Sequence, residues 1–245
     1  MPTVGARQRY LFMHIPKTAG MVLYQRLIRH HGAGAVHPLP FDQGRQGAYM
    51  DINYVTTRMS EHPEIRVIAG HYPLCLDEVL GIPLTTFTVL RDPVERALSM
   101  VRQHQQRDEE FRDKSLDDVY SDPVLLHGLI HNYMVRVLTM EPSELRNGVM
   151  TMVPYDEDRL EKAKHNLEHH VAAFGVQEAF ESFCNELRSR FGWELGDVAA
   201  YPNRTARAVV SDELRERIAH DNAFDVQLYD FAKGLLARQS TTATS

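Results

Sequence analysis

The sequence predicts an α/β protein in which a central, mainly parallel sheet is flanked by helices and the C-terminal half is rich in helix. Short apolar runs bounded by Gly or Pro alternate with helical patterns, which is typical of a parallel sheet covered on both faces. The chain has 245 residues, of which 43% are hydrophobic and 24% charged, so it can bury a large core. We expect a single domain over residues 1–237 and a disordered polar tail over 238–245.

Four segments carry the strand signal, which is a short β-branched or apolar run between turn-forming residues. The fourth segment is a weaker match than the first three. The first strand precedes Pro16, the second ends at Gly70, and the third precedes Arg91, so polar residues follow all three. Because ligands bind at the carboxyl ends of parallel strands, we expect the functional site at this edge. The predicted strands are 10–13, 66–70, 84–90 and 171–175.

Helical patterns fill most of the chain between and after these strands. One begins directly after Gly20. Another begins at Asp92 and Pro93, where Asp92 can cap the helix and Pro93 suits its first position. The last pattern is long, and we expect an interruption near Asp221. The predicted helices are 21–28, 94–106, 123–138, 156–169, 177–191 and 211–236.

The heptapeptide HIPKTAG, from His14 to Gly20, joins the first strand to the first helix. A tight turn here directs backbone N–H groups and the positive end of a helix at one point, which favours an anion such as phosphate. Lys17 adds a mobile positive charge, Thr18 a hydroxyl donor, and Gly20 a close approach of the backbone. The domain is therefore P-loop-like, although the loop is shorter than the Walker pattern and lacks its first glycine. A surface turn with a solvated lysine is the alternative.

Two further segments bring polar residues to the same edge of the sheet. His71 follows the second strand, and an imidazole can act as a general base at neutral pH. Arg91 follows the third strand, and Ser99 lies about two turns into the next helix, so both can reach one anion. The structural alternatives are an ion pair of Arg91 with Asp92 or Glu95, and packing of Ser99 against a neighbour.

The composition argues against several classes of protein. The formal net charge of −6 disfavours a nucleic-acid binder. No run approaches the roughly 18 apolar residues of a membrane span, and the N-terminus has no signal-peptide core, so we expect a cytoplasmic protein. Cys75 and Cys184 form neither a disulfide framework nor a metal motif, and we expect both to be buried and inert. No His or Cys cluster has metal-ligand spacing, so we expect no metal.

Two segments together resemble the cofactor-binding signatures of sulfotransferases that use 3′-phosphoadenosine 5′-phosphosulfate (PAPS). They are HIPKTAG and, further along the chain, FTVLRDPVERALS. The resemblance is to the carbohydrate type related to heparan sulfate 2-O-sulfotransferase, and it extends from Tyr10 to Lys233. AGHYPL, NYMVRVL, FGVQEAFESFCNELRSRFGW, NRT and DVQLYDFA resemble further segments of that family, in the same order.

The resemblance implies that His71 is the catalytic base and that Lys17 lies near the bridging oxygen that leaves with the nucleotide. It implies that Arg91 and Ser99 bind the 3′-phosphate, and that Arg204 contacts this phosphate or the adenine side. Sulfuryl transfer is an in-line displacement, so such an enzyme mainly positions its substrates and stabilises negative charge. The loop that would hold the 5′-phosphosulfate consists of Pro16, Lys17, Thr18, Ala19, Gly20 and Met21.

The chain departs from the family pattern after Gly20. Met21 and Val22 stand where the family commonly has Thr and Ser, whose hydroxyls bind the 5′-phosphate, so we expect weaker cofactor binding. The acidic charge and the expected lack of a membrane anchor favour a small-molecule or saccharide acceptor over a long polyanionic glycan. His14, expected inside the first strand, and His104 are rivals of His71 as the base.

Two other functions stay open at this point. A nucleotide or small-molecule kinase would carry a fuller glycine-rich loop and an acidic magnesium ligand, and the sequence has neither. A non-catalytic nucleotide-binding protein would retain the fold and the cofactor without turnover. For an enzyme, the acceptor group is a hydroxyl or, as the alternative, an amine. We expect residues 32–50 to form a flexible substrate loop. Candidates for an acceptor cleft are Arg45, Arg58 and the stretch from Arg102 through Arg107, although charged helix faces are usually solvated.

Overall fold

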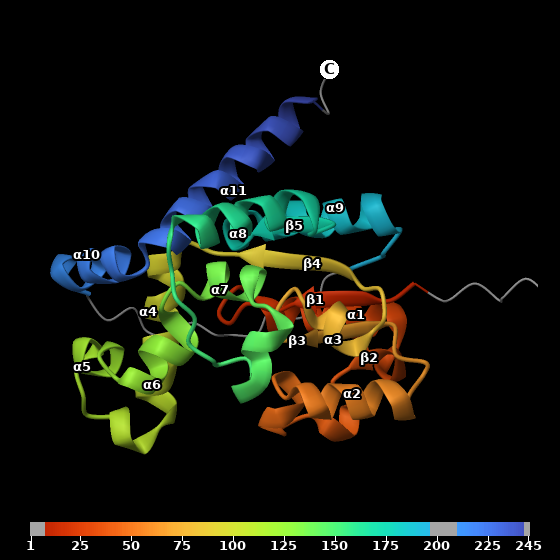
Figure 1. Cartoon of the computed structure of the whole chain (residues 1–245), viewed down its shortest axis with the longest axis horizontal. Coiled ribbons are helices and arrows are strands. Elements are labelled where there is room, and N and C mark those ends of the chain that lie inside the picture. Colours follow the sequence, from red (N-terminus) through yellow and green to blue (C-terminus); the bar gives the residue numbers. More distant parts are fainter. Residues whose placement is uncertain (1–7, 197–209, 243–245) are drawn as a thin grey trace, which may run out of the picture.

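The computed structural model describes residues 8–196 and 210–242, and this part contains five parallel strands in the order β2-β3-β1-β4-β5 (Figure 1). Helices flank the sheet and dominate the C-terminal half. The predicted α/β class is therefore confirmed. The strands are β1 (Tyr10–Met13), β2 (Val36–His37), β3 (Val67–Gly70), β4 (Thr85–Leu90) and β5 (Ala173–Val176).

Strand β1 lies at the centre of the sheet, and all of its residues are buried. Its last residue, Met13, pairs with Gly70 of β3 and with Thr88 of β4. The chain builds β2 and β3 on one side of β1 and then crosses to the other side for β4 and β5. Because such a reversal opens a crevice at the carboxyl ends of the strands, the loop that follows β1 lies at the expected binding edge.

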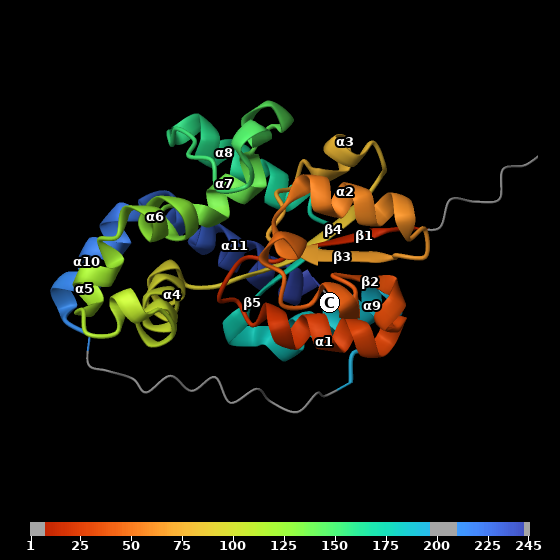
Figure 2. The ribbon, with the colours of Figure 1, turned by 90° about the horizontal axis from the view of Figure 1, so that it is seen from below.

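One face of the sheet is covered by α1 and α9, which lie together on one side in Figure 2. Phe12 of β1 stacks on Phe87 of β4 with ring centroids 5.3 Å apart, and Tyr10 meets Trp193 edge-on at 4.7 Å. These aromatic pairs bury large apolar surfaces where the helices meet the sheet. The two helices are α1 (Gly20–His31) and α9 (Phe180–Phe191).

The opposite face holds a second core around Leu11 and Met13, which alternate with Tyr10 and Phe12 along β1. It is covered by α2 (Ile52–Glu61), α3 (Leu76–Leu80), α7 (Tyr133–Thr139), α8 (Glu157–His169) and α11 (Ala223–Thr242). A third core lies beside the sheet, at the left in Figure 1. It joins α4 (Pro93–Arg107), α5 (Leu116–Tyr120), α6 (Pro123–Leu125) and α10 (Asp212–Asp221).

The single helix predicted over 123–138 is wrong. Helix α6 ends at Leu125, residues 126–130 form a π-helical turn, and Asn132 has a left-handed φ of 43° before α7 begins. The guanidinium groups of Arg96 and Arg136 donate to the carbonyl oxygens of residues 127–130. These buried carbonyl groups therefore have partners without a continuous α-helix, which allows the break.

The interruption predicted near Asp221 is confirmed, because α10 ends at this residue and α11 begins at Ala223. Helix α11 continues to Thr242, past residue 237, where we expected a disordered tail to begin. Among the residues of α11 up to 239, whose burial the structure describes, the last one in the buried core is Leu235. Because an existing helix extends at little cost per residue, it runs beyond its packed part.

The stretch 32–50, expected to be a flexible substrate loop, instead contains β2 and three short 3₁₀ helices. Its residues Leu39 and Asp42 are buried. Arg58, a candidate for the acceptor cleft, forms an ion pair with Asp42 at 3.0 Å and so ties this stretch to α2. Strand β2 has only two residues, which is too short for a periodic signal in the sequence.

We expect the folded state to lose stability as the pH falls from the ordinary histidine value of 6.5 to about 4. Burial lowers the pKa of His37 to about 4, and burial likewise lowers the pKa of His31 to about 4. In this range the unfolded chain binds more protons than the folded one, so acid favours unfolding. The replacement His37→Gln should flatten this dependence, because glutamine can keep the 2.8 Å hydrogen bond to the Ala48 carbonyl without titrating.

Urea denaturation across that pH range measures the effect. A suitable control is His220→Gln, because the His220 side chain is 90% exposed, and its pH profile should match that of the unmodified protein. An equally steep profile in His37→Gln would contradict the prediction.

Candidate functional site

The loop after β1 turns sharply into α1. Lys17 and Ala19 have left-handed φ values of 71° and 64°, and the helix begins at Gly20. In the described structure no side chain caps this end of α1, and its first turn contains no acidic residue. The amides of Val22 and Leu23 donate to the Ala19 carbonyl oxygen at 3.0 and 3.3 Å, whereas those of Gly20 and Met21 have no partner among the described residues. These two amides and the positive end of the helix dipole therefore remain available to an anion.

Thr18 does not offer its hydroxyl to this site, contrary to expectation. Its side chain is fully buried, and Oγ1 donates to the Ile15 carbonyl oxygen at 2.8 Å. The single hydroxyl proton thus closes the loop instead of facing a ligand. Pro16 is also buried and has no N–H group, while Met21 is 44% exposed and has no side-chain donor.

Positive charge gathers around Lys17. Its ammonium donates to Gln103 Oε1 on α4 at 2.7 Å, and Arg91 Nη1 donates to the Lys17 carbonyl oxygen at 2.9 Å. Burial lowers the pKa of Lys17, and the charges of Arg91 and Arg107 lower it further. An anion bound here would relieve this repulsion, so the electrostatics favour a negatively charged ligand.

Arg91 is held toward the loop, and the ion pair with Asp92 or Glu95 that was its structural alternative is not formed. Within the described residues, Glu95 pairs instead with Arg215 at 2.9 Å. Asp92 caps α4 by accepting from the Glu95 amide at 3.0 Å, as predicted. Burial lowers the pKa of the Arg91 guanidinium, and the acidic groups nearby, of which Glu95 has the largest effect, oppose this.

Ser99 lies one helical turn before Gln103 on α4, so it shares the side of the helix from which Gln103 reaches Lys17. The residue is half-buried, and its hydroxyl has no hydrogen-bond partner among the described residues. It therefore remains available to a ligand. Arg204 lies in 197–209, outside the described residues, and its role stays a prediction.

His71 follows β3 and is held from two sides. Its Nδ1 lies 2.7 Å from the His14 carbonyl oxygen, and its amide donates to the Tyr49 carbonyl oxygen at 2.7 Å. A carbonyl oxygen can only accept, so Nδ1 carries the proton and Nε2 is left with a lone pair. Burial lowers the pKa of His71 from its ordinary value of 6.5, which keeps the ring neutral at pH 7. The ring is therefore in the state that a general base requires.

Of the two rival histidines, His14 differs from expectation and His104 is engaged elsewhere. His14 was expected inside β1, but the strand ends at Met13, and the His14 ring lies half-buried with its centroid 4.7 Å from that of His71. His104 Nδ1 lies 2.6 Å from Asp108 Oδ2, so this ring is engaged at the far end of α4. Sequence reasoning missed Gln103, although its spacing of one turn from Ser99 is a usable signal.

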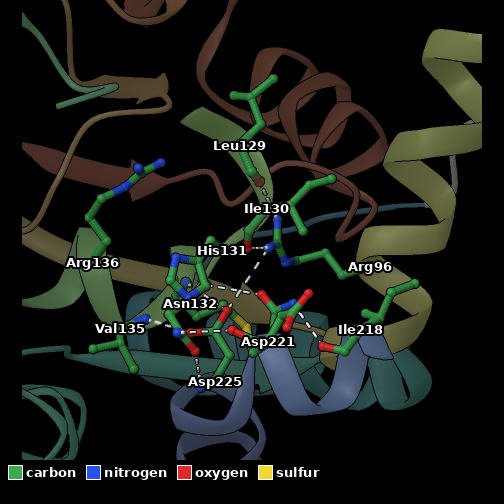
Figure 3. A network of polar contacts seen from close by, with 12 residues as sticks. Arg96, Leu129, Ile130, His131, Asn132, Val135, Arg136, Ile218, Asp221 and Asp225 are labelled. Carbon is green, nitrogen blue, oxygen red and sulfur yellow. Dashed lines mark hydrogen bonds and ion pairs between the residues drawn. The ribbon is translucent and has the colours of Figure 1, made fainter. Parts of the chain in front are cut away.

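A buried polar network holds α4 against α7 and α11 (Figure 3). Arg96 donates to the carbonyl oxygens of Leu129 at 2.9 Å and Ile130 at 2.6 Å, and its guanidinium lies 3.9 Å from the Asp225 carboxylate. Asp225 also accepts from two amides of α7 at 3.1 and 2.9 Å. The helix that carries Ser99 and Gln103 is thereby tied to the C-terminal half of the chain.

A cavity of about 560 Å³ lies beside this network rather than at the loop after β1. Of the site residues predicted from the sequence, those that the structure describes do not line it. Its wall combines histidine, aromatic and apolar side chains. The lining residues are His127, His131, Asn132, Met152, Val153, Pro154, Tyr155, His220, Asp221, Ala223 and Phe224.

Comparison with models of known protein families and with curated proteins finds no match for this chain. Among the described helices, none has the length and apolar character needed to cross a membrane. Over residues 8–196 and 210–242, no group of three or more His, Cys, Asp or Glu side chains is placed to hold a metal ion. The function is therefore inferred from the geometry at the end of β1.

Proposed function

We propose that this protein is a PAPS-dependent sulfotransferase that transfers a sulfuryl group to a hydroxyl of a small-molecule or saccharide acceptor. The observation that carries the proposal is the convergence of Lys17, Arg91 and a neutral His71 around the uncapped start of α1. A phosphosulfate needs a positively charged binding site, and an acceptor hydroxyl needs a base. The positive charges and the candidate base lie together at this edge of the sheet.

The loop residues fit an anionic nucleotide. The free amides of Gly20 and Met21 and the ammonium of Lys17 would hold the 5′-phosphosulfate, and PAPS supplies the sulfuryl group when bound. Arg91 and the free hydroxyl of Ser99 would bind the 3′-phosphate, where a planar guanidinium can donate two parallel hydrogen bonds. Lys17 would exchange its bond to Gln103 for one to the bridging oxygen.

The proposed reaction is one in-line displacement. His71 Nε2 accepts the proton of the acceptor hydroxyl while the acceptor oxygen bonds to sulfur. The bond between sulfur and the bridging phosphate oxygen breaks, and Lys17 stabilises the charge that grows on this oxygen. The products are the sulfate ester and adenosine 3′,5′-bisphosphate, and the proton on His71 passes to solvent.

The first test is calorimetric titration with adenosine 3′,5′-bisphosphate, AMP, and ATP with magnesium. We expect the bisphosphate to bind more tightly than AMP. Arg91→Ala should weaken the affinity for the bisphosphate by about tenfold to a hundredfold, the usual contribution of a charged hydrogen bond. Lys164→Ala, which removes the partner of the exposed Glu161 on α8, is the matched control and should change nothing.

Tight binding of ATP with no preference for a 3′-phosphate would contradict the proposal and favour the kinase. Bisphosphate binding without sulfate transfer to any acceptor in a broad panel would instead favour the non-catalytic alternative.

A further inference from the structure

The loop of the proposed site is poor in side-chain donors where the 5′-phosphosulfate would lie. The Thr18 hydroxyl donates its hydrogen bond inside the loop, to the Ile15 carbonyl oxygen, and the side chains of Met21 and Val22 have no donor. Within loop residues 16–22, Lys17 is the remaining side-chain donor. A second donor must therefore come from a residue outside this stretch or be absent from the site.

The imidazole of His14 lies directly on the start of α1. A methyl group at Gly20 would come within 1.8 Å of His14 Nε2 and 1.9 Å of Cδ2, so the ring fits only because Gly20 has no side chain. The Phe12 ring stacks on the His14 ring, with ring centroids 5.3 Å apart. Neither ring nitrogen of His14 has a hydrogen-bond partner among the described residues, and the side chain is half-buried. The ring is thus held in place while its polar atoms stay available.

We propose that His14 is a phosphate-binding residue that donates a ring N–H hydrogen bond to the 5′-phosphosulfate at the start of α1, in place of the hydroxyls that Met21 and Val22 lack. This inference rests on the proposed function, because it assigns a further residue to the same nucleotide site. It also explains why the loop has a glycine where α1 begins.

Binding at His14 has a consequence for protons. The charged and titratable groups acting on His14 are Lys17 of the loop and His71 at the end of β3, whereas Phe12 and Gly20, which pack on the ring, carry no charge. Burial above all, and then His71 and Lys17, lower the pKa of His14 well below 6.5, so the ring is neutral without ligand. A bound anion acts in the opposite direction. Cofactor binding should therefore be accompanied by proton uptake at His14.

Calorimetric titration of the His14→Phe and His14→Gln variants with AMP and with adenosine 3′,5′-bisphosphate tests the inference. Phenylalanine keeps a ring of similar size without a donor, whereas glutamine keeps a donor that does not titrate. We expect His14→Phe to weaken both nucleotides by the same factor, about tenfold to a hundredfold, because both carry a 5′-phosphate. His14→Gln should retain most of the affinity. By contrast, Arg91→Ala should mainly weaken the bisphosphate.

Proton uptake is the readout that a merely structural role would not move. Titrations with the bisphosphate near pH 6, in two buffers of different ionisation enthalpy, should give a smaller uptake in His14→Gln than in the unmodified protein. Equal uptake in the two proteins overturns the inference, as do unchanged affinities in a folded His14→Phe. In either case a preference of the unmodified protein for the bisphosphate over AMP leaves the proposed function standing. If the unmodified protein binds neither nucleotide, the proposed function itself is overturned.

Discussion

Replacing Arg96 with methionine should lower the free energy of unfolding by about 3–5 kcal/mol, the range measured when one partner of a buried ion pair is removed. Arg96 and Asp225 are both fully buried, and the carboxylate lies 3.9 Å from the guanidinium (Figure 3). The variant leaves Asp225 with two amide donors and, of the two cations that lower its pKa, only Arg136. It also leaves the carbonyl oxygens of Leu129 and Ile130 without their donors.

The loss should grow with pH. Burial raises the pKa of Asp225 even with Arg96 present, and removal of this cation raises it further. Between the ordinary aspartate value of 3.8 and the raised pKa, the folded state then binds more protons than the unfolded one. The free energy of unfolding therefore falls as the pH rises from 3.8. Urea denaturation at several pH values measures both the size of the loss and its sign.

Two further variants complete this experiment. The double variant Arg96→Met with Asp225→Asn should recover part of the loss. The buried charge is gone, while the asparagine side-chain oxygen can still accept a hydrogen bond from one backbone amide of α7. Lys164→Met removes one partner of an ion pair in which Glu161 is 66% exposed, and it should cost less than about 1 kcal/mol. A loss in Arg96→Met as small as that of Lys164→Met would contradict the role assigned to the network.

Replacing His71 with asparagine should lower the rate of the proposed sulfuryl transfer by about 10²–10⁴-fold, the usual contribution of a general base. The asparagine amide can take over the hydrogen bond from Nδ1 to the His14 carbonyl oxygen, but it has no basic atom in place of Nε2. Affinity for adenosine 3′,5′-bisphosphate should stay within about twofold, because the change leaves the anion site intact. Parallel rate and binding measurements on the same preparation separate the two effects.

The pH profile provides a second test of His71. Burial lowers its pKa below 6.5, so the rate should stay level at neutral pH and fall only in more acidic solution, where Nε2 takes up a proton. In His71→Asn the residual rate should lose this acidic limb. If this variant retained both the rate and the acidic limb, the base would be another residue. His14→Asn is then the comparison to make, because the His14 ring centroid lies 4.7 Å from that of His71.

Much of the fold could be predicted from the sequence because its signals are local. The strands at 10–13, 66–70 and 84–90 are bounded by Gly or Pro, and the structure has them within one residue. The helix cap at Asp92 could also be predicted from the sequence, since capping depends on neighbours within one turn. The prediction of one helix over 123–138 was wrong because the break in it depends on residues far away in the sequence. Arg96 is 33 residues from its partner Leu129, and Asp225 is 91 residues from Met134.

The candidate site divides along the same line. The sequence by itself determined that Lys17, His71 and Arg91 follow three strands, and a parallel sheet brings the ends of such strands to one edge. Only the tertiary structure decided that Thr18 bonds inward and that the ring of His14 lies on the start of α1. The physical reason is that a periodic pattern specifies which face a residue occupies, whereas each hydrogen bond is chosen among partners that only the completed packing brings together.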